Sequence, residues 1–158
     1  MKTAHRQASQ AKRRWQADPS ALSRVMNRLQ PFSAPELVQL QTPVRVAFES
    51  LRSGRGEEDD FHTLAAVVNV ALIRSEAIDP LCVETCERAQ QALLRVLERR
   101  RRSGLWGFDG PALQDIPPAI ELHEQLLALS TPLQMQRAMN ETLRRMSAGQ
   151  VHRLEQRT

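Results

Sequence analysis

The stretch EEDDFHTLAAVVNVAL, residues 57–72, decides the fold class. Its apolar residues recur every three or four positions, which is the period of one face of an α-helix. These residues are Phe61, Leu64, Val68, Ala71 and Leu72. Four acidic residues precede them, and the helix dipole favours negative charge in the first turn. The stretch therefore predicts an amphipathic helix that opens with residues 57–60 and extends to about Ile78.

The same period on both sides of this stretch predicts an all-α fold. Proline follows a capping residue at Asp18-Pro19, Thr42-Pro43, Asp79-Pro80 and Thr131-Pro132. Proline is favoured at the first helical position because its missing N–H would be unpaired there in any case. Helices are expected over residues 18–30, 33–53 with a kink or restart at Pro43, 57–78, 80–103, 117–129 and 131–148. In the last one, the predicted buried stripe is Met135, Met139, Leu143 and Met146.

No segment alternates apolar and polar residues over the length of a strand. We therefore predict a small bundle of five to six antiparallel helices joined by short loops, with the longest loop over residues 105–116. Residues 1–17 carry little apolar periodicity and predict a basic flexible tail. A single helical domain is expected over residues 18–150, followed by a C-terminal tail over residues 151–158.

Composition narrows the class of protein. The 158 residues are 41% hydrophobic with a net charge of +4, which excludes a wholly disordered chain. No apolar run approaches the roughly 18 residues of a membrane span, so no membrane partner is expected. The first residues lack the apolar core of a secretory signal, and two cysteines cannot form a disulfide framework. The expected location is the cytoplasm.

Positive charge is gathered in clusters that suggest contact with nucleic acid. The run 12–15 joins three cations to an indole, which suits phosphate contact combined with base stacking. The run 99–102 closes a helix, where the dipole favours cations. Successive residues point about 100° apart around a helix, so part of this run faces solvent or a partner. The candidate nucleic-acid-binding residues are Lys12, Arg13, Arg14, Trp15, Arg99, Arg100, Arg101 and Arg102. The alternative is a solvated tail and a solvated helix end.

The glycine-rich loop over residues 104–111 contains Trp106 and Phe108. If exposed, these rings are candidate partner-binding anchors, and if buried they close the open end of the bundle. Three methionines of the last helix, Met135, Met139 and Met146, leave a similar choice between an adaptable binding groove and the core.

Motifs for catalysis and metal binding are absent from the sequence. Cys82 and Cys86 are four residues apart and would share one helix face, where His62 or His123 could complete a metal site. The usual C-x-x-C spacing is missing, however, and Cys86 fits the apolar stripe as a core residue. No nucleophile elbow, P-loop or dinucleotide fingerprint occurs. We expect a protein that is not an enzyme, with no cofactor, no metal and no catalytic residue.

Two segments, AFESLRSG (residues 47–54) and DDFHTLAAVVNVA (residues 59–71), carry a family resemblance. Over roughly residues 35–100 the chain resembles short, mostly uncharacterised helical proteins carried by phages, prophages and plasmids of Gram-negative bacteria. The resemblance implies an accessory protein of a mobile genetic element, and it lends no activity and no catalytic residues.

Two functions remain after these exclusions. The first is a non-enzymatic accessory or regulatory protein of a mobile genetic element that contacts nucleic acid through its basic clusters. No helix-turn-helix signature is present, so contact with the phosphate backbone is expected more than base reading. The alternative is a protein-binding inhibitor or modulator of a host protein, such as an anti-defence factor. DNA, RNA and protein all stay open as targets, and so does assembly into a homo-oligomer.

Overall fold

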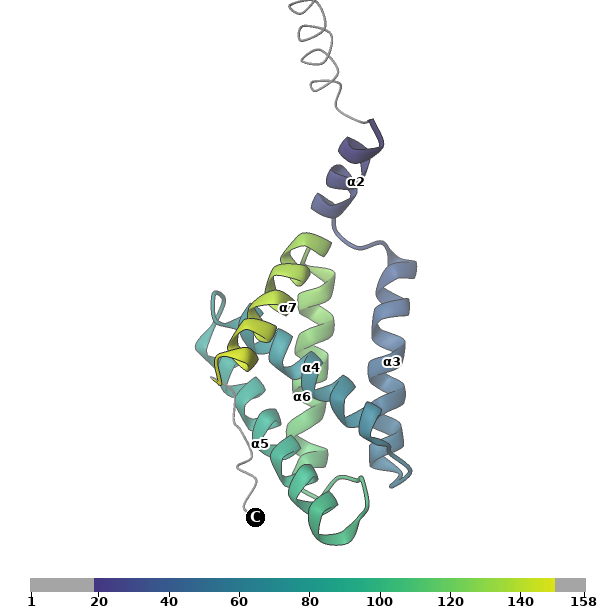
Figure 1. Cartoon of the computed structure of the whole chain (residues 1–158), viewed down its shortest axis with the longest axis vertical. Coiled ribbons are helices and arrows are strands. Elements are labelled where there is room, and N and C mark those ends of the chain that lie inside the picture. Colours follow the sequence, from purple (N-terminus) through teal and green to yellow (C-terminus); the bar gives the residue numbers. More distant parts are fainter. Residues whose placement is uncertain (1–18, 150–158) are drawn as a thin grey trace, which may run out of the picture. The chain divides into compact units, whose positions relative to one another are not determined.

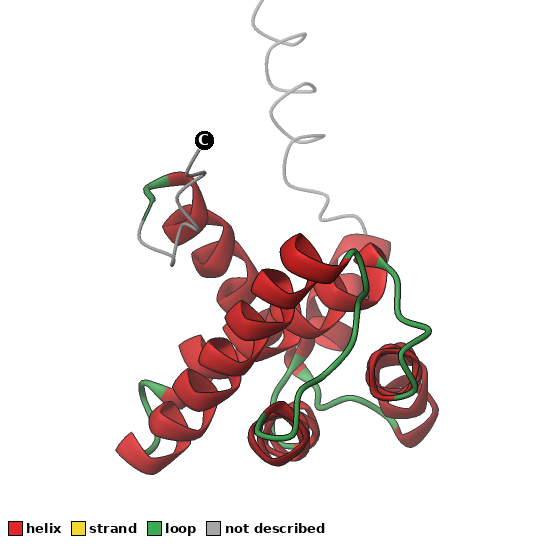
Figure 2. Cartoon of the chain, turned by 90° about the horizontal axis from the view of Figure 1, so that it is seen from below, coloured by secondary structure: helices red, strands yellow, loops and turns green. Residues whose placement is uncertain are grey.

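The computed structural model describes residues 19–149, and this part of the chain is all-α (Figure 2). Its helices are α2 (Pro19–Leu29), α3 (Ala34–Arg52), α4 (Glu58–Ser75), α5 (Pro80–Ser103), α6 (Ala112–Ala128) and α7 (Pro132–Ser147). The described residues contain no strand, and the one β-type contact is an isolated bridge between Gly56 and Trp106. The predicted all-α class is confirmed, whereas the antiparallel arrangement stays a prediction.

Backbone contacts divide the chain into two units, residues 1–30 and residues 31–158. The first unit contains α2, which has proline at its first position and Arg28 in its last turn. Both residues are favoured at those helix ends. The second unit contains α3 to α7. Since α2 is grouped with the residues before it, the single domain over residues 18–150 stays a prediction.

The helix starts of the second unit follow the expected capping signals. Glu36 accepts hydrogen bonds from the backbone N–H and the hydroxyl of Ser33 before α3, at 2.8 and 2.7 Å. Asp60 accepts from the N–H of Glu57 before α4, and Asp79 accepts from the N–H of Leu81 at the start of α5. Thr131 and Gln134 bond reciprocally before α7. These bonds satisfy first-turn amides that have no partner within the helix.

The structure corrects one expectation that rested on proline and narrows another. The expected loop over 105–116 ends early, because α6 already begins at Ala112, and Pro117 and Pro118 lie inside it. The Asp109 carboxylate accepts from the N–H of Ala112 at 2.7 Å and so starts the helix before the prolines. The helix α3 passes through Pro43 without a restart, and the alternative of a kink at Pro43 stays a prediction. Proline after a capping residue is therefore not sufficient to start a helix.

The core is built around α4, which packs against α3, α5, α6 and α7 (Figure 1). Its main cluster includes Leu51, Leu64, Val68, Val96 and Ile116, each at most 1% exposed. A smaller cluster joins α4, α6 and α7 and consists of Val70, Leu127, Met135 and Ala138. None of the described helices is long and apolar enough to cross a bilayer.

The predicted buried stripe of α7 is correct only at Met135. Ala138 and Thr142 are its other buried positions, whereas Met139, Leu143 and Met146 are 56%, 55% and 47% exposed. Both stripes have a helical period and differ by a small rotation about the helix axis. The small side chains of Ala138 and Thr142 face the bundle, whereas the larger apolar side chains of the predicted stripe lie next to this buried face and are open to solvent.

Candidate functional site

Two connecting segments meet at one end of the second unit, the turn between α3 and α4 and the loop between α5 and α6. The backbone of Gly56 pairs with that of Trp106. A Cβ built on Gly107 would lie 3.6 Å from the carbonyl oxygen of Leu51 and 3.7 Å from the Cα of Gly54. The α5–α6 loop therefore packs directly on the end of α3.

Replacing Gly56 with alanine should lower the free energy of unfolding by about 1–3 kcal/mol, because overpacking forces neighbouring atoms to move. Its Cβ would lie 2.5 Å from Cδ2 of Leu51 and 3.0 Å from the Cα of Leu51, which is backbone. Gly110→Ala is the matched control, since nothing lies within 4 Å of the added carbon. Urea denaturation followed by circular dichroism compares the two. Equal midpoints for both variants would contradict the close packing at Gly56.

The aromatic rings of the α5–α6 loop are turned toward the bundle. Phe108 is 8% exposed, and its ring centroid lies 5.2 Å from that of Phe48. Trp106 is half-buried and stacks on Phe61 at 5.0 Å. These contacts favour the closing of the bundle end over the partner-binding role expected for Trp106 and Phe108. Phe108 in particular belongs to the hydrophobic core.

The basic run at the end of α5 is divided by its contacts. Arg99 donates to the carbonyl oxygen of Phe108 at 2.7 Å. Arg100 donates to the carbonyl oxygen of Gly104, and its guanidinium lies over the ring of Trp106, 5.6 Å from the centroid. Arg99 and Arg100 therefore hold the α5–α6 loop in place, and the Trp106 ring is already engaged by Phe61 and Arg100.

Arg95 adds a second anchor that the sequence analysis did not single out. Its guanidinium forms ion pairs with Asp109 at 3.2 Å and Asp115 at 3.1 Å, so it ties α5 to the start of α6. The signal in the sequence was the spacing of Arg95 one turn before Arg99, on the same face of a helix.

All four arginines of the run are exposed, and Arg101 and Arg102 are the two without a partner. Neither makes a hydrogen bond or ion pair with the described residues. Arg55, in the adjoining α3–α4 turn, is also exposed and contacts only the hydroxyl of Ser53 among side chains, at 3.3 Å. Arg55 lies between Gly54 and Gly56, a pattern that by itself predicts only the end of a helix.

Charge is distributed unevenly between the two units. Residues 31–149 contain 13 arginines and 16 carboxylates, a net charge of −3, whereas residues 1–30 contain seven basic residues and one acid. Within 31–149, six arginines form ion pairs: Arg45, Arg52, Arg88, Arg95, Arg144 and Arg145. The other seven arginines of residues 31–149 form no ion pair with the described residues. The other predicted nucleic-acid-binding residues, Lys12, Arg13, Arg14 and Trp15, lie outside the described residues.

The cysteines do not contribute to this end of the unit. Cys86 is fully buried with its Sγ 4.0 Å from the Ser75 hydroxyl, and burial raises the pKa of its thiol to about 11. Such a thiol is a poor nucleophile at neutral pH. Cys82 is half-buried. Within residues 19–149, no three His, Cys, Asp or Glu side chains come together as ligands for a metal ion.

Comparison with known proteins gives no relative for this arrangement. No protein-family model, curated protein or solved structure matches the chain. The resemblance to helical proteins of mobile elements therefore stays a prediction.

Proposed function

We propose that the protein is a non-enzymatic accessory or regulatory factor of a mobile genetic element that contacts the phosphate backbone of nucleic acid in the bacterial cytoplasm. Its contacts would be the basic N-terminal run Lys12, Arg13 and Arg14, with Trp15 as a stacking residue, and the exposed pair Arg101 and Arg102. This narrows the predicted run over residues 99–102 to its second half.

The observation that carries the proposal is the exposed, unpaired state of Arg101 and Arg102 in a unit where six other arginines are neutralised by carboxylates. Guanidinium groups that are free of internal partners can form bidentate contacts with phosphate. The concentration of positive charge in residues 1–30 supports the same target. Contact through phosphates predicts binding without sequence preference.

Fluorescence anisotropy with labelled duplex and single-stranded DNA tests the proposal. Between about 50 and about 200 mM salt, log K for the duplex should fall with a slope of about −0.9 per phosphate neutralised. The double variant Arg101→Gln and Arg102→Gln should reduce that slope by about 2, and the triple variant Lys12→Gln, Arg13→Gln and Arg14→Gln by about 3. Both sets of substitutions are made in the full chain.

The matched control is the double variant Arg88→Gln and Arg144→Gln. These arginines are 54% and 60% exposed but engaged with Glu84 and Glu141, so the control removes the same charge without removing free guanidinium groups. It should leave the slope unchanged. Absence of binding at low salt would contradict the proposal for DNA. An equal reduction of the slope in both double variants would mean that only the net charge of the protein matters, which would contradict the role of Arg101 and Arg102.

A second candidate function, a modulator of a host protein, is favoured by the exposed face of α7. Met139, Leu143 and Met146 lie at positions i, i+4 and i+7 and form an apolar stripe open to solvent. Methionine-rich stripes adapt to partner surfaces. A stoichiometric complex with one host protein that Leu143→Glu abolishes, together with absence of DNA binding, would favour this function over the first.

A further inference from the structure

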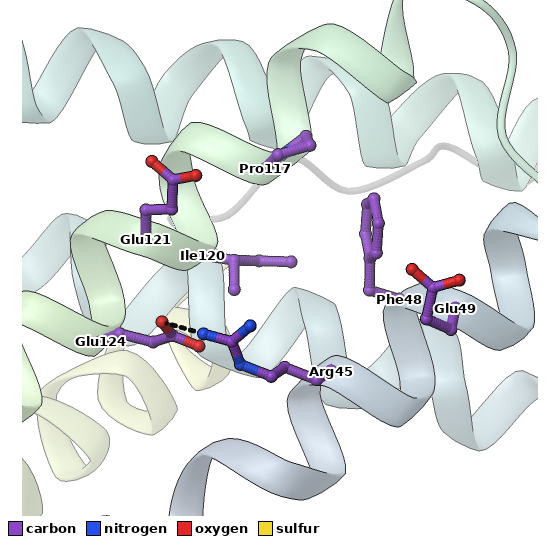
Figure 3. Close-up of a pocket in the computed structure, with 7 residues that line it drawn as sticks. All are labelled: Arg45, Phe48, Glu49, Pro117, Ile120, Glu121 and Glu124. Carbon is purple, nitrogen blue, oxygen red and sulfur yellow. Dashed lines mark hydrogen bonds and ion pairs between the residues drawn. The ribbon is translucent and has the colours of Figure 1, made fainter.

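A groove of about 370 Å³ lies between α3 and α6, away from the exposed arginines discussed above (Figure 3). Its walls come from two helices: Arg45, Phe48 and Glu49 on α3, and Pro117, Ile120, Glu121 and Glu124 on α6. Phe48, Pro117 and Ile120 supply apolar surface, and the remaining side chains are charged. The size matches small-ligand sites, which are apolar with a few placed polar groups.

The charged residues of the groove are mostly carboxylates. Three glutamates and one arginine line the groove, and Glu49 is already paired with Arg52 at 2.7 Å. Glu121 is exposed and makes no hydrogen bond or ion pair with the described residues. Glu121 and Glu124 are three residues apart, so they lie on the same side of α6. The groove therefore favours a cation.

Glu124 is the most buried of these carboxylates. Its side chain is only 16% exposed, its Oε2 accepts from Arg45 at 2.6 Å, and its Oε1 is buried with no hydrogen-bond partner. A carboxylate has room for about four hydrogen bonds, and leaving a buried acceptor unpaired costs free energy. Because Oε1 is closed to solvent, a ligand in the groove would engage Glu124 at Oε2, in place of Arg45.

Arg45 already shows which donor this carboxylate accepts. Its guanidinium extends from α3 to Glu124 (Figure 3), yet the side chain is 66% exposed. An exposed ion pair of this kind contributes little stability, so a competing guanidinium can take its place at small cost. A displaced Arg45 would remain hydrated at the surface.

We propose that this groove binds the arginine side chain of a basic peptide. The alkyl stem would lie against Phe48 and Ile120, and the guanidinium would replace that of Arg45 at Oε2 of Glu124. Charge complementarity and the observed Arg45–Glu124 pair select a guanidinium over a neutral or anionic ligand. This site is independent of the proposed nucleic-acid contacts.

The test is an NMR titration of the full chain with N-acetyl-arginine methylamide as the probe. Backbone amide shifts are expected around residues 45–49 and 117–124, with an affinity in the millimolar range. The citrulline analogue has the same shape without the charge and should produce no saturable shifts. No shifts with the arginine probe, or equal shifts with both probes, would overturn the proposal.

Variants identify the carboxylates. Glu124→Gln should weaken binding about fivefold to tenfold, and Glu121→Gln about threefold, whereas Glu87→Gln, on α5, should have no effect. Arg45→Gln should tighten binding, because it removes the competing guanidinium. An equal loss of affinity for the arginine probe in Glu87→Gln and Glu124→Gln would contradict the proposal, and so would weaker binding in Arg45→Gln. Circular dichroism establishes that each variant is folded.

Discussion

Replacing Leu51 with alanine should lower the free energy of unfolding by about 3–5 kcal/mol. Leu51 is fully buried at the end of α3, where the α3–α4 turn and the α5–α6 loop meet. The substitution removes three carbon atoms from a site whose surroundings cannot easily collapse. The bridge between Gly56 and Trp106 ties the two segments to each other, and the hydrogen bond from Arg99 to Phe108 ties the loop to α5. These contacts keep both segments from moving into the space that the leucine side chain vacates.

The control for this prediction is Val46→Ala on the same helix. Val46 is 57% exposed, so its loss should change stability by no more than about 0.5 kcal/mol. Urea denaturation followed by circular dichroism measures both variants. A loss below about 1 kcal/mol for Leu51→Ala would mean that the end of α3 is not packed as the structure describes.

The features of the fold that could be predicted from the sequence are those fixed by neighbours in the chain. Asp79 and Pro80 start α5, and Gly104 ends it with a left-handed φ of 76°. Each of these depends on a few adjacent residues. The start of α6 depends on Asp109, which caps the helix even though two prolines follow inside it. The face that α7 buries depends on which helix packs against it.

The candidate site shows the same division. The sequence predicts that Arg99–Arg102 form one cluster, but its members differ through partners that local spacing does not specify. Arg99 bonds to a carbonyl nine residues later, and Arg100 lies over Trp106. The groove between α3 and α6 could not be predicted at all, because Arg45 and Glu124 are 79 residues apart.

Lowering the pH from 7 to 5 should reduce the stability of the protein by about 2 kcal/mol through His123 alone. His123 is 6% exposed, its Nδ1 makes no hydrogen bond, and burial lowers its pKa to about 4. The unfolded chain has a histidine pKa of about 6.5, so between these values the unfolded state binds the proton more tightly. Stability is complete above about pH 6.5 and falls as the pH decreases, by about 3 kcal/mol once the pH is below 4.

Urea denaturation at pH 7 and pH 5 measures this effect, and His123→Leu removes the titrating group from the same apolar site. The difference in stability between the two pH values should shrink by about 2 kcal/mol in that variant. His62→Gln is the matched control, because the His62 side chain is 64% exposed and gains no comparable burial on folding. The pH window lies above the ordinary pKa of carboxylates, and Glu141, whose pKa is lowered to about 2 by hydrogen bonds from Arg144 and Arg145, stays ionised throughout. An unchanged pH dependence in His123→Leu would show that His123 is hydrated or hydrogen-bonded in the folded protein, since burial without a partner is the only cause of the expected loss.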